Sequence, residues 1–299
     1  MGQVPFGRPA LIKDYIALTK PRITWLILMS TGVGYFFGAQ KGSLGWTGWH
    51  FVTLIHTIIG TGLIASGTAA LNQWYEREAD AKMRRTQARP LPAGRLDARN
   101  ALVFAIAISA AGFGELWFGA NPLAAMLGLI TLLTYLFVYT PLKQRSPHST
   151  TIGAIPGAMP PLIGFAAANG ALTWDAWVLF AILFLWQFPH FYAIAWMYKD
   201  DYARAGIRML PVVEPDGKST AGRILMYSIA LIPISLMPKF FAMAGNIYLY
   251  GAIALGLAFL YYGLRIRWDR TRQQARRVLL ASVVYLPVLF SLMLFDRPA

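Results

Sequence analysis

Apolar runs of about 20 residues recur along the 299-residue chain, and they constrain its fold more than any other feature. A run of about that length is what an α-helix needs to cross the hydrocarbon core of a bilayer. In lipid, every backbone N–H and C=O group must be paired within the protein, which favours continuous helices. We therefore predict an all-α integral membrane protein, a bundle of nine transmembrane helices near residues 22–40, 51–75, 99–119, 122–140, 150–168, 174–198, 222–244, 247–265 and 278–295.

The run at 150–168 carries three prolines, Pro156, Pro160 and Pro161, which interrupt helical hydrogen bonding. Such breaks survive at membrane depth where neighbouring helices or a cavity satisfy the freed backbone groups. No segment between the runs is long enough for a soluble domain, so residues 1–299 are predicted to form a single transmembrane domain. The longest loops, 76–99 and 199–221, have a length that is usually functional or disordered.

Lysine and arginine are distributed unevenly between the two sides of the predicted bundle. The nine-span topology places 24 of the 27 Lys and Arg residues on one side, and only Lys41, Lys239 and Arg297 on the other. Positively charged loops stay in the cytoplasm, so the N-terminus is predicted to be cytoplasmic and the C-terminus to lie outside. The net charge of +14 is therefore explained by topology in a lipid bilayer, and nucleic acid is not an expected partner.

The chain contains no cysteine, which excludes disulfides and thiolate metal sites. Any metal is therefore expected on oxygen or nitrogen ligands. The first 20 residues lack a contiguous apolar core and a small-residue cleavage site, so no cleaved signal peptide is expected.

Three oxygen-bearing side chains form a predicted acidic stripe where the second span ends. Asn72, Glu76 and Asp80 are spaced four apart, so on a helix each lies about 40° round from the last, on one face. Facing lipid, each acid would cost about 2.5–3.5 kcal/mol, so we place the stripe in a polar cavity at the helix end. Such oxygen ligands suit Mg²⁺, which binds through one or two carboxylates and the phosphates of a substrate.

Three arginines follow the acidic stripe in the same loop: Arg84, Arg85 and Arg89. Guanidinium groups bind phosphate oxygens in a paired geometry, so these arginines would suit the same substrate. The alternative interpretation of the whole segment is a solvated helix end followed by an ordinary positive cytoplasmic loop. Spacing alone leaves both open.

A second polar cluster lies near the end of the sixth predicted span. His190 sits within an apolar segment, behind a proline. Ionisable groups inside spans are functional candidates, although a lone histidine is often a hydrogen-bonding packing residue. Lys199, Asp200 and Asp201 follow at the helix end. The two adjacent aspartates diverge by about 100° on a helix, so only one of them can point at a shared metal.

Two further cationic clusters are predicted at the same side of the bundle. Lys143 can bind a phosphate as a point charge, with Tyr139 as a donor one turn away, and Lys20 and Arg22 open the first span. Each cluster alone is indistinguishable from positive-inside anchoring. All four clusters nevertheless fall at cytoplasmic helix ends. This convergence suits an amphipathic diphosphate, with its apolar tail among the helices and its diphosphate at the mouth.

Several short motifs add a family resemblance that covers residues 14 to 213. The Asn-acid-acid pattern of the acidic stripe is accompanied by Pro-Pro-Leu-Ile-Gly at 160–164, Trp-Gln-Phe-Pro-His-Phe at 186–191 and Asp-Asp-Tyr at 200–202. The other matching motifs are Asp14-Tyr15, Thr19-Lys20-Pro21-Arg22, Arg85-Thr86, Arg89-Pro90-Leu91-Pro92, Tyr139-Thr140, Ala205-Gly206 and Met209-Leu210-Pro211. Together they resemble the UbiA superfamily of intramembrane prenyltransferases, and within it the branch that farnesylates heme.

The resemblance implies that farnesyl diphosphate and heme b react to give heme O, with Mg²⁺ as cofactor, at the cytoplasmic side of a bacterial-type inner membrane. It implies heme A synthase or terminal oxidase assembly as partners for the product. The implied metal ligands are Asn72, Glu76, Asp80 and Asp201, and Tyr139 and Lys143 join the first three in the catalytic group. The implied substrate-binding residues are Lys20, Arg22, Arg84, Arg85, Arg89, His190, Lys199, Asp200 and Asp201.

The chain departs from the superfamily pattern in two places. Glu76 stands where aspartate is more common, and it still supplies a carboxylate. Tyr198 and Tyr202 flank the aspartate pair at 200–201, where the superfamily commonly has two aspartates four apart. The departure at the second motif leaves open which of Asp200 and Asp201 coordinates the metal and whether a second Mg²⁺ binds.

Two alternative functions stay open. A sister prenyltransferase that acts on an aromatic quinone precursor or a chlorophyllide-like ring would share most of these motifs, and Pro160, Pro161 and His190 favour the heme branch instead. A secondary transporter can also show broken helices and intramembrane charges. Here, however, the charges cluster at the cytoplasmic helix ends and the middle of the bundle is nearly free of charge.

Overall fold

The computed structural model describes residues 8–41 and 48–297, and no strand occurs within these ranges. Residues 1–7, part of the segment in which no signal peptide is expected, lie outside the described residues. The helices are α1 (Arg8–Leu18), α2 (Pro21–Lys41), α3 (Gly48–Tyr75), α4 (Arg77–Ala81), α5 (Ala98–Gly119), α6 (Pro122–Leu133), the π-helical segment Thr134–Tyr139, α7 (Thr140–Leu142), α8 (Ser149–Gly157), α9 (Pro160–Asn169), α10 (Trp174–Met197), α11 (Lys199–Arg204), α12 (Leu210–Val213), α13 (Lys218–Phe240), α14 (Asn246–Trp268) and α15 (Arg272–Phe295).

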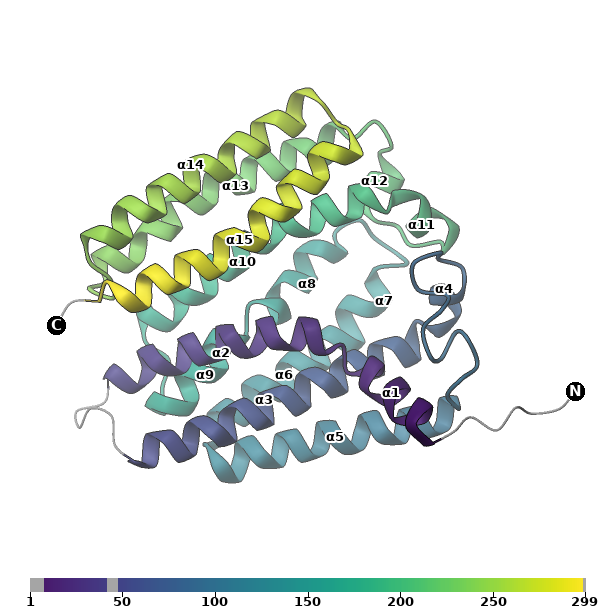
Figure 1. Ribbon diagram of the computed structural model, residues 1–299, viewed down its shortest axis with the longest axis horizontal. Helices are drawn as coiled ribbons and strands as arrows, with labels where there is room; N and C mark the ends of the chain where they lie inside the picture. Colours follow the sequence, from purple (N-terminus) through teal and green to yellow (C-terminus); the bar gives the residue numbers. More distant parts are fainter. Residues whose placement is uncertain (1–7, 42–47, 298–299) are drawn as a thin grey trace, which may run out of the picture.

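Eight helical spans of the described chain are long and apolar enough to cross a membrane. They correspond to eight of the nine predicted spans, which confirms an all-α, multi-pass membrane protein. The remaining predicted span corresponds to α2, a 21-residue helix that is not among those eight. It runs lengthwise in the bundle beside the others (Figure 1). The ninth crossing and the orientation of the termini therefore stay predictions.

The short helix α9 lies between the two groups of long helices. Eight of its ten residues are buried, and it packs along α2 and against α3, α6 and α10. Two glycines let α2 and α9 approach closely, because a Cβ on Gly34 would lie 2.1 Å from the Pro161 carbonyl oxygen and one on Gly164 would lie 1.9 Å from that of Thr31. Small residues at such interfaces let helix backbones meet. Through α9, the hydrophobic core of α3, α5 and α6 adjoins that of α10 and α13–α15.

The predicted proline break is confirmed before Pro160 and Pro161, between α8, which ends at Gly157, and α9, which begins at Pro160, whereas Pro156 lies inside α8 and does not interrupt it. Gln187 on α10 ties this break to the next helix, since its Nε2 donates to the Ala154 carbonyl oxygen at 2.9 Å. A Cβ at position 157 would lie 2.2 Å from the Gln187 Oε1. A side chain at position 157 would therefore displace the Gln187 amide from this hydrogen bond.

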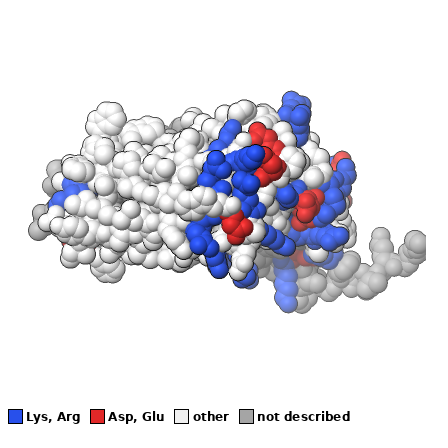
Figure 2. All heavy atoms as spheres, turned by 90° about the horizontal axis from the view of Figure 1, so that it is seen from above, with Lys and Arg blue, Asp and Glu red and all other residues white. Residues whose placement is uncertain are grey.

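Charged side chains gather at one end of the molecule, and the rest of the visible surface is nearly free of them (Figure 2). The same end carries α1 and the short helices α4, α11 and α12, whereas α15 finishes at the opposite end (Figure 1). Between the ends, large apolar side chains such as Ile106, Ile229 and Val284 are exposed on the outside of the bundle. The predicted concentration of charge at one set of helix ends is thus seen in the folded chain.

Candidate active site

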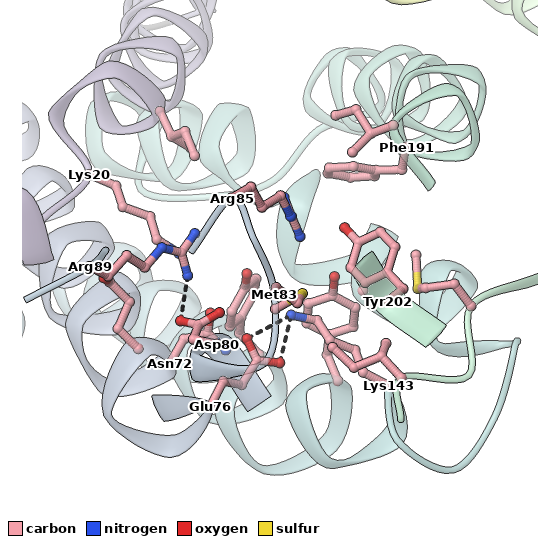
Figure 3. Close-up of a pocket in the computed structure, with 18 of the residues that line it drawn as sticks. Lys20, Asn72, Glu76, Asp80, Met83, Arg85, Arg89, Lys143, Phe191 and Tyr202 are labelled. Atoms are coloured by element: carbon pink, nitrogen blue, oxygen red, sulfur yellow. Dashed lines mark hydrogen bonds and ion pairs between the residues drawn. The ribbon is translucent and has the colours of Figure 1, made fainter. Parts of the chain in front are cut away.

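A polar cavity of about 630 Å³ lies at the charged end of the bundle. Its polar lining comes from the turn between α1 and α2, α3, α4, the loop after α4, the π-helical segment, the end of α7, α8 and α11. Figure 3 shows the labelled side chains converging on it. The polar lining residues are Lys20, Asn72, Gln73, Glu76, Asp80, Arg85, Arg89, Arg95, Tyr135, Tyr139, Lys143, Thr150 and Tyr202, and the larger apolar ones include Ile23, Met83, Phe191, Ile194, Ile207 and Met209.

The acidic stripe forms one wall of this cavity. The Glu76 amide donates to the Asn72 carbonyl at 2.9 Å and the Asp80 amide to the Glu76 carbonyl at 2.7 Å, so helical bonding continues from α3 into α4. The prediction that the three side chains share one helix face is therefore confirmed. All three residues are buried, and Asp80 is only 1% exposed. Carboxylates buried this deeply are costly unless they are paired.

Each member of the stripe is paired with a residue from another segment. Lys143 Nζ lies 3.0 Å from Glu76 Oε1, and Arg89 Nη1 lies 2.6 Å from Asp80 Oδ2 (Figure 3). The Asn72 amide nitrogen donates to Thr140 Oγ1 at 3.2 Å, which leaves the amide oxygen as the group available to a cation. The cations thus neutralise the acids and also stand where a phosphate could approach.

The pKa values of two lysines at the cavity, Lys143 and Lys20, are shifted in opposite directions. Burial disfavours the charged ammonium of Lys143, but the Glu76 carboxylate, its hydrogen bond to the ammonium, and Tyr139 and Tyr135 together raise the pKa of Lys143 well above its ordinary value. For Lys20, burial together with the positive charges of Arg89 and Lys143 lowers the pKa to about 7. Lys20 also holds a left-handed φ of 48° in the turn between α1 and α2, a conformation uncommon outside glycine.

The predicted span at 122–140 is not a regular α-helix, because Thr134–Tyr139 is π-helical. Single π-helical turns are rare and frequently occur at functional sites. Tyr135 and Tyr139 both line the cavity, with ring centroids 4.9 Å apart, and Lys143 Nζ lies 4.6 Å from the Tyr139 ring centroid. Thr140 Oγ1 donates to the Tyr135 carbonyl at 2.8 Å, so the hydroxyl that accepts from Asn72 also joins this segment to the acidic stripe.

The second predicted cluster contributes Tyr202 to the cavity. The Arg85 guanidinium lies 5.2 Å from the ring centroid of Tyr198 and 4.8 Å from that of Tyr202. Asp201 is buried, accepts a hydrogen bond from the Arg84 backbone amide at 3.2 Å, and forms an ion pair with Arg204. These contacts join α11 to the loop after α4 and keep Arg85 beside the cavity.

His190 lies on α10 but does not line the cavity, whereas its neighbour Phe191 does. The His190 Nδ1 is 2.8 Å from the Ser282 Oγ on α15, and that hydroxyl donates its own proton to the Leu279 carbonyl at 2.7 Å. Nδ1 must therefore be the donor, which leaves the lone pair on Nε2. Trp186 stacks on the imidazole with ring centroids 5.0 Å apart. The orientation of His190 is thus set by α15 and not by the acidic stripe.

The structure brings eight of the predicted site residues together around the cavity: Lys20, Asn72, Glu76, Asp80, Arg85, Arg89, Tyr139 and Lys143. Six others are not among the lining residues: Arg22, Arg84, His190, Lys199, Asp200 and Asp201. Arg22, Arg84 and Asp200 are exposed, and the Lys199 ammonium lies 4.4 Å from the Trp196 ring centroid. The roles given to these six from the sequence stay predictions.

Five polar lining residues are not among the predicted site residues: Gln73, Arg95, Tyr135, Thr150 and Tyr202. Tyr135 lies four residues before Tyr139, a spacing that is visible in the sequence but looks like ordinary apolar periodicity inside a span. Thr150 is buried, and its hydroxyl has no hydrogen-bond partner in the described part of the chain. A bound molecule could use this hydroxyl, and no sequence signal marks it.

The chemistry of the acidic stripe fits a divalent cation that is shared with ligand oxygens. Within residues 8–41 and 48–297, no three His, Cys, Asp or Glu side chains form a group that could hold a metal ion unaided. Two carboxylates and an amide oxygen leave several positions of an octahedral Mg²⁺ open, and Mg²⁺ usually fills such positions with water and substrate phosphates. The surrounding lysine and arginine donors suit those phosphates.

Relatives with the same overall length are found by sequence. A profile of the UbiA prenyltransferase family matches residues 27–288. The chain is 65% identical over 291 residues to a protoheme IX farnesyltransferase of Solibacter usitatus, covering 96% of this chain and 99% of that one. It is 49% identical over 298 residues to a protoheme IX farnesyltransferase of Koribacter versatilis, covering 97% and 95%.

Solved structures show the same fold at lower identity. A structure described as a digeranylgeranylglyceryl phosphate synthase matches with a TM-score of 0.77 at 15% identity, covering 95% of this chain and 98% of that one. A UbiA homolog from Archaeoglobus fulgidus bound to GPP and Mg²⁺ matches with a TM-score of 0.66 at 17% identity, covering 94% and 99%. Because the family profile spans most of the helices and the sequence relatives are nearly full-length, the chain belongs to the UbiA prenyltransferase family.

Proposed function

We propose that this prenyltransferase transfers a farnesyl group from farnesyl diphosphate to a vinyl group of heme b, with addition of water, and so makes heme O. The full-length relatives named protoheme IX farnesyltransferase support the donor and the acceptor. The observation that carries the chemistry is the buried stripe of Asn72, Glu76 and Asp80, held against Lys143 and Arg89 at the mouth of an apolar bundle. Membership of a prenyltransferase family sets the transporter alternative aside.

Mg²⁺ held by Asn72, Glu76 and Asp80 would supply positive charge to the departing diphosphate. The structural neighbour bound to GPP and Mg²⁺ supports this choice of cation. Arg89 and Lys143 stand beside the same acids and are placed to donate hydrogen bonds to phosphate oxygens as negative charge develops there. For Asp201, which the sequence reasoning placed among the metal ligands, we propose a positioning role instead, because its carboxylate accepts from the Arg84 amide and forms an ion pair with Arg204.

The reaction breaks the C1–O bond of farnesyl diphosphate, and the diphosphate leaves with both bonding electrons. Apolar lining residues such as Met83, Phe191 and Ile194 limit the access of water to the allylic cation. A heme vinyl carbon then forms a new bond to C1. Water adds to the resulting cation and releases a proton, which leaves a hydroxyethylfarnesyl group on the heme.

The experiment that tests this function supplies the purified protein in lipid with farnesyl diphosphate, heme b and Mg²⁺. We expect heme O, identified by chromatography and mass, and none when the diphosphate is omitted. An aromatic quinone precursor and a chlorophyllide are offered as acceptors in parallel. Product formed only with one of those acceptors would replace the proposal by the sister activity.

The low pKa of Lys20 predicts that diphosphate binding weakens as the pH rises above 7. The unliganded Lys20 loses its proton above a pKa of about 7, whereas a bound diphosphate favours the charged ammonium, so binding at pH 8 to 9 must take up a proton. We expect the Kd for farnesyl diphosphate to rise between pH 7 and pH 9 by up to about tenfold per pH unit. Calorimetry in buffers of different ionisation enthalpy measures the proton uptake.

Lys20→Arg is the matched control, because a guanidinium stays charged over this range. The pH dependence should flatten in this variant while binding at pH 6.5 stays close to that of the unchanged protein. The same slope in both proteins would show that another group titrates.

We also propose that the charged end of the bundle faces the cytoplasm of a bacterial-type inner membrane, so that heme O is released there or into the bilayer towards heme A synthase or terminal oxidase assembly. The uneven distribution of 24 against 3 Lys and Arg residues supports this orientation. A reporter fused after Ala299 should therefore be active only outside the cytoplasm. Cytoplasmic reporter activity would mean an even number of crossings.

A further inference from the structure

A largely apolar groove of about 330 Å³ lies between α14 and α15. The two helices pack against each other as an antiparallel pair, joined by the turn at residues 269–271 (Figure 1). No residue that lines this groove also lines the active-site cavity. The groove is therefore a separate feature of the molecule, which the proposed function does not use.

Small side chains between larger ones make the hollow. Ala258 and Ala281 line it from the two helices, and the buried rings of Phe259 and Tyr285, which are 2% and 1% exposed, form its floor. Val284, which is 58% exposed, stands at its edge, and Ala258 is exposed as well. The groove thus opens outward from the bundle, where the acyl chains of a bilayer would lie.

The groove ends at Arg277, which is the one charged side chain among its described lining residues. Val284 follows Arg277 by seven residues on α15, and Leu255 precedes Tyr262 by seven on α14, so the groove extends about 10 Å along both helices. One leaflet contributes about 15 Å to the hydrocarbon core of a bilayer. The groove therefore matches the upper part of an acyl chain whose headgroup lies beside Arg277.

Exposed aromatic side chains place the membrane–water interface at the same level. Tyr261, next to Tyr262 at the mouth of the groove, is 54% exposed, and Trp268 at the end of α14 is 74% exposed. Tyrosine and tryptophan are enriched where a membrane meets water. The Arg277 guanidinium thus lies at the depth of lipid phosphates.

Most of the Arg277 guanidinium is available to a ligand. Its one hydrogen bond to another described residue runs from Nη1 to the Gln274 Oε1 at 3.4 Å. A guanidinium carries five N–H donors in a planar fork that matches the geometry of phosphate oxygens. The free donors of Arg277 therefore suit a phosphodiester.

The surroundings of Arg277 are strongly positive. Asp269 is the only acid between residues 246 and 295, and it accepts hydrogen bonds from Gln274 and Thr271. The same stretch contains six arginines: Arg265, Arg267, Arg270, Arg272, Arg276 and Arg277. Such clusters beside membrane helices attract anionic lipids, and a zwitterionic lipid would bring its own cation towards them. Positive-inside topology explains the number of arginines, but it does not explain a groove that ends at one of them.

We propose that the groove between α14 and α15 binds one anionic phospholipid, with its phosphate on Arg277 and an acyl chain over Ala258 and Ala281. The arginines at the turn between the two helices select the negative charge of the headgroup. The hollow made by the two alanines selects a ligand that carries an acyl chain.

The first test titrates phosphatidylglycerol or phosphatidylcholine into the detergent-solubilised protein and counts bound lipids by native mass spectrometry. We expect the first phosphatidylglycerol to bind about tenfold more tightly than phosphatidylcholine. Arg277→Gln should weaken the first phosphatidylglycerol by about fivefold or more and change phosphatidylcholine little. Arg99→Gln, at an exposed position of α5 at the same charged end, is the matched control and should keep the preference.

The second test fills the groove with Ala258→Leu. The change adds bulk where the acyl chain would lie, and it does so from an exposed position that the fold tolerates. We expect binding of the first phosphatidylglycerol to weaken by about tenfold, because each buried CH₂ group contributes to binding. Ala107→Leu, the same change at an exposed position of α5, should have no such effect.

Equal phosphatidylglycerol binding by Arg277→Gln and Arg99→Gln would overturn the proposal, because the arginines would then act only as a diffuse surface charge. Unchanged binding by Ala258→Leu would also overturn it, since no acyl chain would occupy the groove. Displacement of the lipid by inorganic phosphate would identify a phosphate-ion site in its place. Thermal unfolding without added lipid checks the fold of each variant, and if Arg277→Gln unfolds, Ala258→Leu decides the question.

Discussion

Asp80→Ala is expected to lower the rate of heme O formation by roughly 1,000-fold or more, because it removes a metal ligand that acts on the leaving diphosphate. Asp80 is almost fully buried, and its charge is matched by Arg89 at 2.6 Å. Raising the Mg²⁺ concentration should restore little of this rate, since one of the two carboxylates of the stripe is missing. Product formation is measured over a Mg²⁺ series, with thermal unfolding and size exclusion as checks on the fold.

Asp97→Ala is the matched control for this prediction. Asp97 lies at the same charged end, outside the cavity, where it caps α5 by accepting a hydrogen bond from the Asn100 amide at 2.9 Å. Its loss should cost about 1 kcal/mol of stability and little activity. A near-normal rate in Asp80→Ala at limiting Mg²⁺ would remove Asp80 from the metal site. Retained Mg²⁺ dependence in that variant would then point to Glu76 and Asn72.

His190→Ala is expected to abolish or strongly weaken heme b binding while leaving farnesyl diphosphate binding nearly unchanged. The structure separates the two effects, because His190 is outside the cavity that holds the acidic stripe. Its Nδ1 is committed to Ser282, so the Nε2 lone pair is the one available to heme iron. Heme absorption spectra, heme titration and product analysis measure the acceptor side, and diphosphate titration measures the donor side.

A purely structural histidine would behave differently. Losing one hydrogen bond costs roughly 0.5–1.5 kcal/mol of stability and should leave the heme spectrum unchanged. His56→Ala is the matched control, since His56 is paired with Glu115 at 2.8 Å, on the side opposite the active-site cavity. Ser282→Ala keeps the imidazole but loses its orienting partner, so it should weaken heme binding less than His190→Ala. An unaltered heme affinity and spectrum in His190→Ala would make His190 a packing residue.

Most of the fold could be predicted because membrane helices are specified locally. The length of each apolar run predicts a crossing, and eight helical spans of the described residues are long and apolar enough to cross a membrane. The prolines of the 150–168 segment predict a break, which is found before Pro160 and Pro161, between α8 and α9, and not at Pro156. The π-helical segment at Thr134–Tyr139 could not be foreseen, because it has the apolar composition of an ordinary span. Its position depends on contacts with other helices, including the hydrogen bond between Asn72 and Thr140.

The candidate site, like the fold, could be predicted from the sequence only where local periodicity or composition determines it. The four-residue spacing of Asn72, Glu76 and Asp80 already determines that they share a face, because helix periodicity depends only on neighbours in the chain. The charge asymmetry of the loops is equally a property of the sequence. The sequence does not determine which cation pairs with each acid, because the partners lie far apart in the chain: Lys143 is 67 residues from Glu76.

Only the tertiary structure decided which clusters meet around one cavity. It brought Lys143 and Tyr135 to the acidic stripe, turned His190 towards α15, and left Asp201 paired with Arg204. It also formed the groove between α14 and α15 that ends at Arg277. The physical reason is that distances between helices depend on packing among segments far apart in the chain. Close approaches such as that of α2 and α9 at Gly34 and Gly164 set those distances, and local periodicity carries no information about them.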